Sequence, residues 1–393
     1  MRLSSRAAAA TASPTLALTA KVNAMKAAGE PIIGFTAGEP DFDTPEHIKD
    51  AARAALAKGL TKYTPSAGTV GLRAAVVEKT QRDSALTYQP KQVIVGCGGK
   101  HVLYLAFQAI LDPGDAVLLP APYWVSYVDM TRLAGGVPVI LPCTAADDLK
   151  LTPARLEAAL ADYPYAKILV LNSPSNPTGV MYNEAELRAL AAVVARHPGL
   201  TVLSDEIYEH LVYDGQRQFS IAQVEEANGQ TVIINGCSKA YSMTGWRIGW
   251  AIGDAGLIDA MTRIASHETS NPTSIAQAAA ETALRGDQGC VEEMRRAFEG
   301  RKRVMIDGLR ALPGVTCNEP GGAFYAFPDV SAHFRPGETA DQFSERLLEK
   351  AKVAVVPGNG FGAPHHVRLS YATSLGDIEA GLARLGDFLA DGG

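Results

Sequence analysis

The sequence predicts an α/β protein with a mostly parallel sheet, helices on both faces of that sheet, and a smaller α+β domain. Short apolar runs alternate with helical patterns through the middle of the chain, which is typical of parallel sheets covered by helices. The 393 residues also exceed one domain of roughly 100–200 residues. We expect a large domain at residues 46–285 and a small C-terminal domain at residues 286–393. Residues 1–45 should form an N-terminal arm and part of the small domain.

The first predicted strand covers residues 93–95 and leads into a glycine-rich turn at residues 96–100. A helix should follow, because Leu103, Phe107 and Ile110 recur at helical spacing. Later apolar runs predict further strands at residues 116–119, 167–171, 201–203 and 231–234. Between the third and fourth of these five strands, Asn183 and Glu186 have the spacing of a helix cap and its partner. We expect that helix to end at Gly199.

The last hundred residues differ from the middle of the chain. Strand-like pieces at residues 323–327, 353–356 and 367–369 alternate there with helices, which indicates a separate α+β unit. The chain before Glu46 should pack with this unit, because its early Gly-Glu-Pro-Asp turn does not belong to the sheet pattern.

Polar or glycine-rich clusters follow several of the predicted sheet strands. They cover residues 98–100, 172–179, 205–208 and 238–247. Ligands of open α/β sheets bind beyond the carboxyl ends of the strands, so we expect these clusters to meet in one crevice.

Composition excludes several classes of protein. The net charge is −6, and apolar and charged residues make up 47% and 20%, as in an ordinary globular chain. Since Lys and Arg form no runs, we expect neither nucleic acid nor a membrane as a partner. Five scattered cysteines without a CxxC motif favour reduced thiols and a cytoplasmic location over disulfides or a zinc site. The first residues carry two arginines before an alanine run, and we favour a mobile arm there over a cleaved signal.

Single motifs leave more than one interpretation open. The turn at residues 96–100 suits anion binding at a helix N-terminus, or is simply a turn that needs glycine. Two prolines in the loop at residues 172–179 favour a rigid, ligand-facing loop. Asp205 directly follows an apolar strand, so it is either a half-buried carboxylate with a partner or a helix cap.

Lys239 lies close after the last predicted sheet strand, where poor solvation would lower its pKa and make it a Schiff-base nucleophile. Arg247, eight residues on, could bind the same anion as the glycine turn. The alternatives are a surface lysine and an arginine in a salt bridge. Arg368 lies in a short strand and needs a carboxylate from the protein or from a ligand. The adjacent His365 and His366 point to opposite faces of a strand, so we expect no metal site.

Taken together, these motifs resemble those of class I pyridoxal-phosphate aminotransferases, and most closely the bacterial subgroup of aspartate and aspartate/prephenate aminotransferases. The resemblance runs in the family's order from about Ser13 onward. It implies the fold type I architecture of pyridoxal-phosphate transferases, with pyridoxal 5′-phosphate in the large domain. The motifs that carry it lie at residues 38–43, 63, 122–127, 176–179, 204–208, 238–247 and 367–373.

The resemblance also implies a role for each matching residue. Lys239 would hold the cofactor as a Schiff base and move the substrate proton, and Asp205 would pair with the ring nitrogen. Tyr208 and Asn176 would bind the phenolic oxygen of the ring, and Trp124 would stack on it. The phosphate would be surrounded by Gly98, Gly99, Lys100, Ser238 and Arg247, with Tyr63 added from the second subunit of a homodimer. The substrate α-carboxylate would be bound by Arg368, with help from Asn176, Trp124 and Gly38.

Two departures from the family pattern affect these expectations. Gly236 occupies a position where the family often has a phosphate-binding serine. Residues 266–273 lack the partner-chain arginine that binds the distal carboxylate in animal and enteric aspartate aminotransferases. Lys100, with Ser13 or Thr15 of the arm, is the substitute that the subgroup implies.

The implied reaction is ping-pong transamination between an amino acid, with aspartate ranked first, and 2-oxoglutarate. Prephenate and aromatic substrates are the alternatives within the family. A pyridoxal-phosphate carbon–sulfur lyase is a further alternative on the same fold. A transcription regulator is disfavoured, because no basic helix-turn-helix precedes the sheet region.

Overall fold

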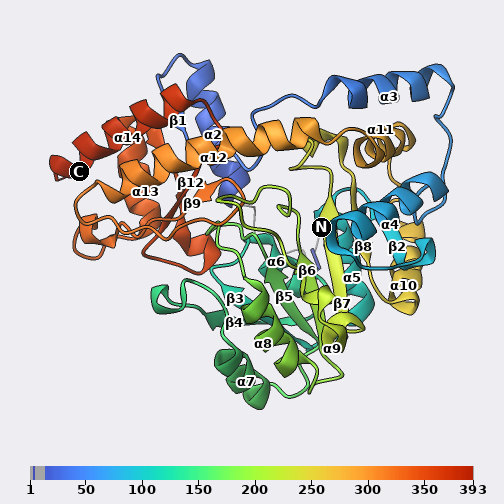
Figure 1. The fold of residues 1–393 in the computed structure, drawn as a ribbon. Coiled ribbons are helices and arrows are strands. Elements are labelled where there is room, and N and C mark those ends of the chain that lie inside the picture. The colour runs from blue at the N-terminus through green and yellow to red at the C-terminus, as the bar shows by residue number, and fades with distance from the viewer. Residues whose placement is uncertain (1–2, 5–13, 393) are drawn as a thin grey trace.

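A computed structural model describes residues 3–4 and 14–392 and is built around one seven-stranded sheet (Figure 1). One strand runs against the other six, so the sheet is mostly parallel, as predicted. In spatial order the strands are β2 (Val93–Gly96), β8 (Gly249–Ile252), β7 (Thr231–Gly236), β6 (Thr201–Asp205), β5 (Ile168–Asn172), β3 (Ala116–Ala121) and β4 (Val137–Pro142). The sequence analysis did not predict β4 and β8.

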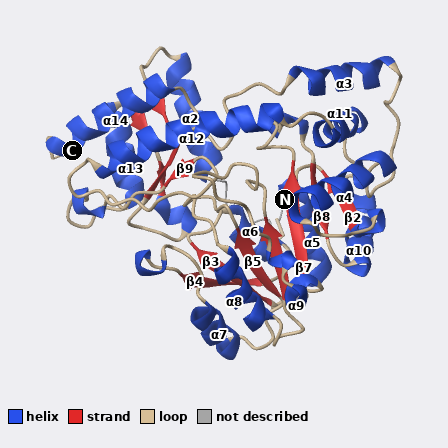
Figure 2. Cartoon of the chain, in the orientation of Figure 1, coloured by secondary structure: helices blue, strands red, loops and turns tan. Residues whose placement is uncertain are grey.

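Helices cover both faces of this sheet (Figure 2). Ile168 and Val170 of β5 pack in the cluster on one face, and Leu169 and Leu171 pack in the cluster on the other. Both sets are buried, because side chains alternate along a strand and each face has its own helical layer. The layer packed with Ile168 comprises α5 (Gly99–Ile110), α6 (Ser126–Leu133) and α10 (Ala255–Glu268). The opposite layer comprises α4 (Val70–Ser84), α7 (Pro153–Asp162), α8 (Glu184–Val194), α9 (Glu225–Asn228) and α11 (Ser274–Arg285), and α3 (Glu46–Ala57) packs on α11.

The start and the end of the chain meet in a second core. Strand β1 (Ile33–Gly34) pairs in parallel with β10 (Val353–Ala354), and Figure 1 shows the blue α2 (Pro14–Ala27) beside the red C-terminal elements. A three-stranded antiparallel sheet lies in the same region, with β12 (Val367–Ser370) between β11 (Val356–Pro357) and β9 (Tyr325–Ala326). The helices around it are α12 (Gly289–Arg310), α13 (Ala340–Ala351) and α14 (Leu375–Ala390).

Three element boundaries differ from the prediction. The capping box of Asn183 and Glu186 is present, but α8 ends at Val194 and not at Gly199. Pro198 explains the early end, because a proline disfavours helical geometry in the residue before it. Ala323 has a φ of +60°, so the predicted strand 323–327 shortens to β9. The predicted strand 353–356 is split, because Val353 pairs with β1 and Val356 with β12.

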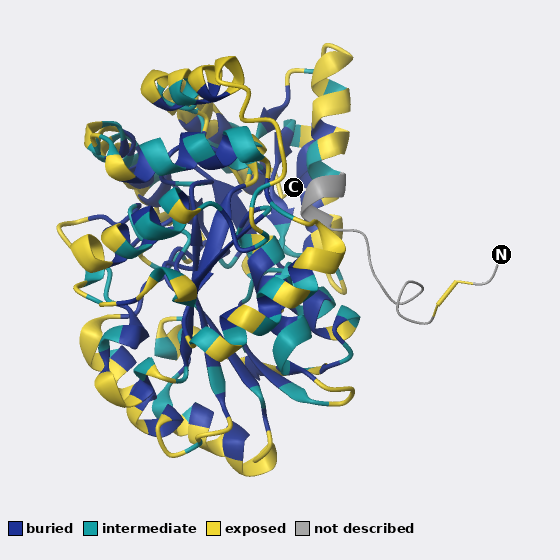
Figure 3. Cartoon of the chain, turned by 90° about the vertical axis from the view of Figure 1, so that its right-hand side faces the viewer, coloured by how far each residue is buried: buried dark blue, intermediate teal, exposed yellow. Residues whose placement is uncertain are grey.

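Burial follows the layers (Figure 3). The inner strands of the large sheet are mostly dark blue, whereas exposed residues lie on the outer helices, the loops and the edge strand β4. Among the described residues, no helix combines the length and apolar character needed to cross a membrane. The carboxyl ends of β5, β6 and β7 open toward the second core, and this is where the polar clusters lie.

Candidate active site

The four predicted clusters meet in one cavity of about 390 Å³. Trp124, Gly38 and Arg368 line it as well, so it lies between the large sheet and the C-terminal core. Gly98 and Tyr63 are the two predicted site residues that do not line it. Those that do are Gly38, Gly99, Lys100, Trp124, Asn176, Asp205, Tyr208, Ser238, Lys239, Arg247 and Arg368.

Lys239 presents its amine to this cavity. It follows the end of β7 by three residues, and its Nζ donates a hydrogen bond to the carbonyl oxygen of Gly38 at 2.6 Å. Burial lowers the pKa of Lys239 to about 8; Glu39 opposes this effect, while Arg247 and Arg368 add to it. An amine that loses its proton near neutral pH is a competent nucleophile.

Asp205 is the last residue of β6 and is 5% exposed. Its Oδ2 accepts a hydrogen bond from the hydroxyl of Tyr127 at 2.6 Å, and its Oδ1 accepts one from the backbone N–H of Ile207 at 3.3 Å. Burial raises the pKa of Asp205 to about 6, although both hydrogen bonds and the charge of Lys239 oppose this rise. The carboxylate therefore titrates close to neutral pH and would favour a cationic partner.

The glycine turn and Arg247 form a cradle for an anion at the start of α5. Gly98 has a φ of +94°, and a Cβ on it would lie 2.3 Å from Nη2 of Arg247, so a larger residue would strain the backbone and displace the Arg247 guanidinium. Arg247 is fixed by hydrogen bonds to the carbonyls of Thr244 at 2.8 Å and Cys97 at 3.2 Å. Backbone N–H groups at a helix N-terminus and a guanidinium together suit a phosphate.

Gly236 has no side chain that could add a hydroxyl to this cradle. A Cβ on Gly236 would lie 2.8 Å from the carbonyl oxygen of Ile248. The serine that the family often has there is therefore excluded by the close approach of the neighbouring strand.

Arg368 is a buried guanidinium with unused hydrogen-bonding capacity. It is 2% exposed; its Nη1 donates to Oδ1 of Asn176 at 2.9 Å and its Nη2 donates to the carbonyl of Thr36 at 3.1 Å. Its Nε is buried without a partner, and no carboxylate of the described residues forms an ion pair with it. Because a buried cation needs an anion, this arrangement is suited to a carboxylate that a ligand brings.

Comparisons with known proteins decide the family. A family model described as "Aminotransferase class I and II" matches residues 30–385. The chain belongs to the class I and II aminotransferase family. Relatives of this aminotransferase include the "Aspartate aminotransferase" of Geobacillus stearothermophilus, 52% identical over 99% of both chains. The "Aspartate/prephenate aminotransferase" of Nitrosomonas europaea is 44% identical over 99% of this chain and 100% of the relative.

Solved structures agree with the family. The aspartate aminotransferase of Rhizobium meliloti superposes with a TM-score of 0.94, at 42% identity and 99% coverage of both chains. The Thermus thermophilus aspartate aminotransferase with maleate gives a TM-score of 0.93, at 45% identity over 98% of this chain and 100% of the other. The predicted family and the fold type I architecture are thus confirmed.

Aminotransferases of this family depend on pyridoxal 5′-phosphate, and the cavity fits that cofactor. Lys239 offers an amine of lowered pKa for its aldehyde, Asp205 a carboxylate for its ring nitrogen, and the cradle at Gly98 a place for its phosphate. The cofactor prediction is therefore confirmed at the level of the family.

The structure also brings residues into this aminotransferase site to which the sequence analysis assigned no role. The hydroxyls of Tyr208 and Tyr325 lie 2.9 Å apart, and Tyr325 packs under Arg368, whose Cζ is 4.4 Å from the centre of its ring. Thr19 of α2 and Glu39 also line the cavity. The sequence carried no signal for Tyr325 or Thr19, because both lie far along the chain from the sheet motifs. Tyr127 lies in the motif at residues 122–127, but nothing in that motif indicated its contact with Asp205.

One predicted contributor, Tyr63, does not reach the cavity of its own chain and is 90% exposed. Ser13 lies outside the described residues, and Thr15 belongs to α2. Residues 266–273 contain no arginine and do not line the cavity.

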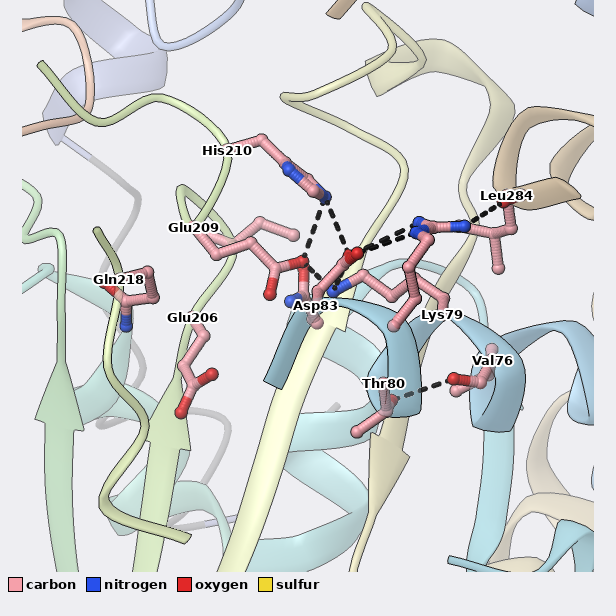
Figure 4. Close-up of polar contacts among 12 residues, drawn as sticks. Val76, Lys79, Thr80, Asp83, Glu206, Glu209, His210, Gln218 and Leu284 are labelled. Atoms are coloured by element: carbon pink, nitrogen blue, oxygen red, sulfur yellow. Dashed lines mark hydrogen bonds and ion pairs between the residues drawn. The ribbon is translucent and has the colours of Figure 1, made fainter. Parts of the chain in front are cut away.

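A second polar cluster joins α4 to Glu209 and His210, which directly follow Tyr208 in the chain (Figure 4). The ammonium of the buried Lys79, in α4, contacts Oδ2 of Asp83 at 3.2 Å and pairs with Glu209. Nε2 of His210 lies 3.5 Å from both carboxylates. Asp83, Glu209 and His210 are spaced closely enough for a metal ion, but Lys79 already supplies the cation between the two carboxylates. This cluster links α4 to the segment after β6.

Proposed function

We propose that this aminotransferase transfers the amino group of aspartate to 2-oxoglutarate in a ping-pong reaction. The observation that carries the proposal is Arg368, a buried guanidinium that faces the cavity with no carboxylate partner among the described residues. Amino acids and 2-oxo acids share an α-carboxylate, which binds a guanidinium through two parallel hydrogen bonds. The names of the relatives support aspartate as the donor.

A second cation supports a dicarboxylate substrate. Lys100 lines the same cavity as Arg368, and its Nζ lies 4.8 Å from the centre of the Trp124 ring. Burial and the charge of Arg247 lower the pKa of Lys100, so an anionic group beside it would be stabilising. Thr19 of α2 is a polar residue that lines the same cavity. We assign the distal carboxylate to Lys100, with Thr19 beside it in place of Ser13 or Thr15.

Each cofactor residue has a task that follows from its chemistry. Bound pyridoxal phosphate supplies an aldehyde for the amino group and a ring that withdraws electrons from the Cα–H bond. Lys239 holds the cofactor between turnovers and moves the proton at Cα as general base and acid. Asp205 keeps its negative charge beside the ring nitrogen. Tyr208 and Asn176 would hold the phenolic oxygen, and Trp124 would hold the ring.

The remaining assignments concern the phosphate and the substrate carboxylate. Gly98, Gly99, Ser238 and Arg247 would hold the phosphate, with Lys100 as a further candidate if it does not serve the distal carboxylate. Arg368 fixes the α-carboxylate, and Asn176, Trp124 and Gly38 complete its site. This fixation aims the Cα–H bond at Lys239, because the carboxylate, the amino group and the proton are then held at three separate points.

We further propose a homodimer in which Tyr63 completes the cavity of the second copy. Tyr63 is 90% exposed, outside its own cavity, and the apolar Leu56, Leu60 and Val70 near it in the chain are exposed as well. Several exposed apolar side chains in one short stretch of the chain favour burial against another chain. We also propose domain boundaries at residues 45 and 285. The pairing of β1, which precedes the first boundary, with β10, which follows the second, supports them. The five cysteines are free, which supports a cytoplasmic location.

Prephenate is the second candidate substrate. The apolar side chains of Leu103 and Val125 line the same cavity as Lys100, and one group of relatives is named for prephenate. An initial-rate panel separates the two: several amino donors with 2-oxoglutarate, and then glutamate or aspartate with prephenate. The proposal expects aspartate to give the highest kcat/KM among the donors. A donor without a distal carboxylate that exceeded aspartate would contradict it.

A further inference from the structure

Tyr127 is a buried tyrosine whose hydroxyl meets the carboxylate of the site. It is 2% exposed, and its hydroxyl donates to Oδ2 of Asp205 at 2.6 Å. The other oxygen of Asp205 accepts a longer hydrogen bond from the Ile207 N–H at 3.3 Å. Tyr127 therefore makes the shorter of these two hydrogen bonds to the carboxylate.

Both the backbone and the ring of Tyr127 are held in place by neighbouring residues. Tyr127 lies in the first turn of α6, and its backbone N–H donates to the carbonyl of Trp124 at 3.0 Å. Its ring stands edge-on to the ring of Trp124, with centroids 5.3 Å apart and planes at 87°. Its carbonyl accepts a hydrogen bond from Thr131 at 2.8 Å. The direction of the hydroxyl is thus set by α6 and not by the strand that carries Asp205.

The main chain of Asp205 is fixed separately. Its carbonyl accepts a hydrogen bond from the side chain of Asn172 at 2.9 Å and another from the N–H of Ser173 at 3.2 Å. Strand β6 and the loop after β5 therefore set the position of its backbone, while Tyr127 sets the orientation of its carboxylate.

The charged and titratable groups that face Asp205 come from three elements. Tyr127 approaches from α6, Tyr208 from the segment after β6, and Lys239 from the loop after β7. Burial raises the pKa of Tyr127 well above its usual value, so its hydroxyl remains a donor throughout the neutral range. An O–H donor stabilises a buried carboxylate, and without such a donor the carboxylate binds a proton more readily.

We propose that Tyr127 is a positioning residue that keeps Asp205 ionised and aimed at the ring nitrogen of the cofactor. The inference rests on the role proposed above for Asp205. It predicts that removal of one oxygen atom, 78 residues away in the chain, changes how cofactor binding depends on pH.

The test is Tyr127→Phe, which keeps the ring against Trp124 and removes only the hydroxyl. Full-length protein freed of cofactor is titrated with pyridoxamine 5′-phosphate, which cannot form a Schiff base with Lys239. Quenching of tryptophan fluorescence gives the Kd at each pH. The titration of the ligand is the same for every protein and cancels in the ratio of Kd values. Tyr123→Phe is the matched control, because it makes the same change four residues earlier and no described hydrogen bond joins Tyr123 to Asp205.

The proposal expects Tyr127→Phe to bind about tenfold more weakly than the unmodified protein at acidic pH, which corresponds to a pKa of Asp205 raised by about one unit. The two Kd values should converge once the pH exceeds both pKa values. Tyr123→Phe should follow the unmodified protein throughout. A uniform loss of affinity at every pH would indicate mere loosening of α6 and would overturn the inference, as would a profile unchanged from that of the unmodified protein.

The variant Asp205→Asn tests the proposed role of Asp205 at the ring nitrogen separately from the inference about Tyr127. The variant should lose the acid limb of the binding profile, because no carboxylate remains to titrate. If it keeps that limb, the role of Asp205 is wrong. If it loses the limb while Tyr127→Phe shifts nothing, the role of Asp205 holds and only the inference about Tyr127 fails.

Discussion

At the scale of single residues, the protonation of Lys239 decides whether the cavity can react. Burial lowers its pKa to about 8, so the amine is protonated below that pH and neutral above it. In the cofactor-free protein, the reactivity of Lys239 toward a neutral amine reagent should therefore rise with pH to a plateau, with a midpoint near 8. Peptide mass spectrometry reads the labelling of each lysine. The exposed Lys91 is the internal reference, and a Lys239 profile that coincides with its profile would contradict the prediction.

Arg368 is the residue on which the proposed substrate class depends. Arg368→Gln should lower kcat/KM for aspartate and for 2-oxoglutarate alike, because both lose the charge that binds their α-carboxylate. Loss of one member of a buried charge pair costs about 2 kcal/mol or more, or roughly 30-fold in kcat/KM. Arg263→Gln, on the exposed face of α10, is the control and should leave both values unchanged. Equal kinetics for the two variants would remove Arg368 from the substrate site.

Lys100 tests the finer specificity. Lys100→Met keeps a long side chain and removes the charge, so kcat/KM should fall more for aspartate than for alanine as the amino donor. The ratio of the two kcat/KM values isolates the distal carboxylate, because any damage to phosphate binding affects both donors. A parallel fall for both donors would place Lys100 at the phosphate only.

At the scale of elements, the segment after β6 is held from behind by α4. Lys79 is 3% exposed and lies between Asp83 and Glu209, so Lys79→Met removes the cation between these two carboxylates, although Arg82 still pairs with Asp83. Breaking a buried pair in this way costs about 3–5 kcal/mol of the free energy of unfolding. Denaturant unfolding followed by circular dichroism measures this loss. Lys91→Met is the surface control, and equal midpoints for the two variants would show that the cluster does not hold the segment.

The sequence was informative for elements that have regular patterns or polar ends. The predicted strands before Lys239 and Asp205 are β7 and β6, because buried parallel strands form continuous apolar runs that end at polar residues. Strand β4 was missed because it is an edge strand with two prolines, and β8 because it is short and begins with glycine. The split after Val353 could not be predicted either, since it depends on which strand each valine pairs with.

In the candidate site, the residues at strand ends could be predicted from the sequence, and those brought in by tertiary packing could not. Lys239, Asp205, Asn176 and the glycine turn were found because they follow strands whose ends meet in space. Tyr127, Tyr325 and Thr19 reach the cavity from a turn of α6, the short strand β9 and helix α2, and only tertiary packing brings them there. The roles assigned to individual residues remain predictions, which the variants described above test.

At the scale of the whole molecule, two chains should share their cavities. If Tyr63 completes the second cavity, a hybrid of Lys239→Ala and Tyr63→Ala chains contains one cavity with both residues intact. Unfolding and refolding the two weakly active proteins together at equal amounts should restore about a quarter of the unmodified activity, because half of the dimers are hybrids with one intact cavity of two. Refolding each variant alone is the control. A mixture no more active than the sum of its parts would show that Tyr63 acts in its own chain or not at all.

The account as a whole depends on the amine of Lys239 as the attachment point of the cofactor. Borohydride reduction of the protein loaded with pyridoxal 5′-phosphate, followed by peptide mass spectrometry, tests this claim most directly. We predict one stoichiometric adduct, on the peptide that contains Lys239, and none on that peptide in Lys239→Ala. An adduct that maps to Lys100 or to another lysine, with Lys239 unmodified, would contradict the account.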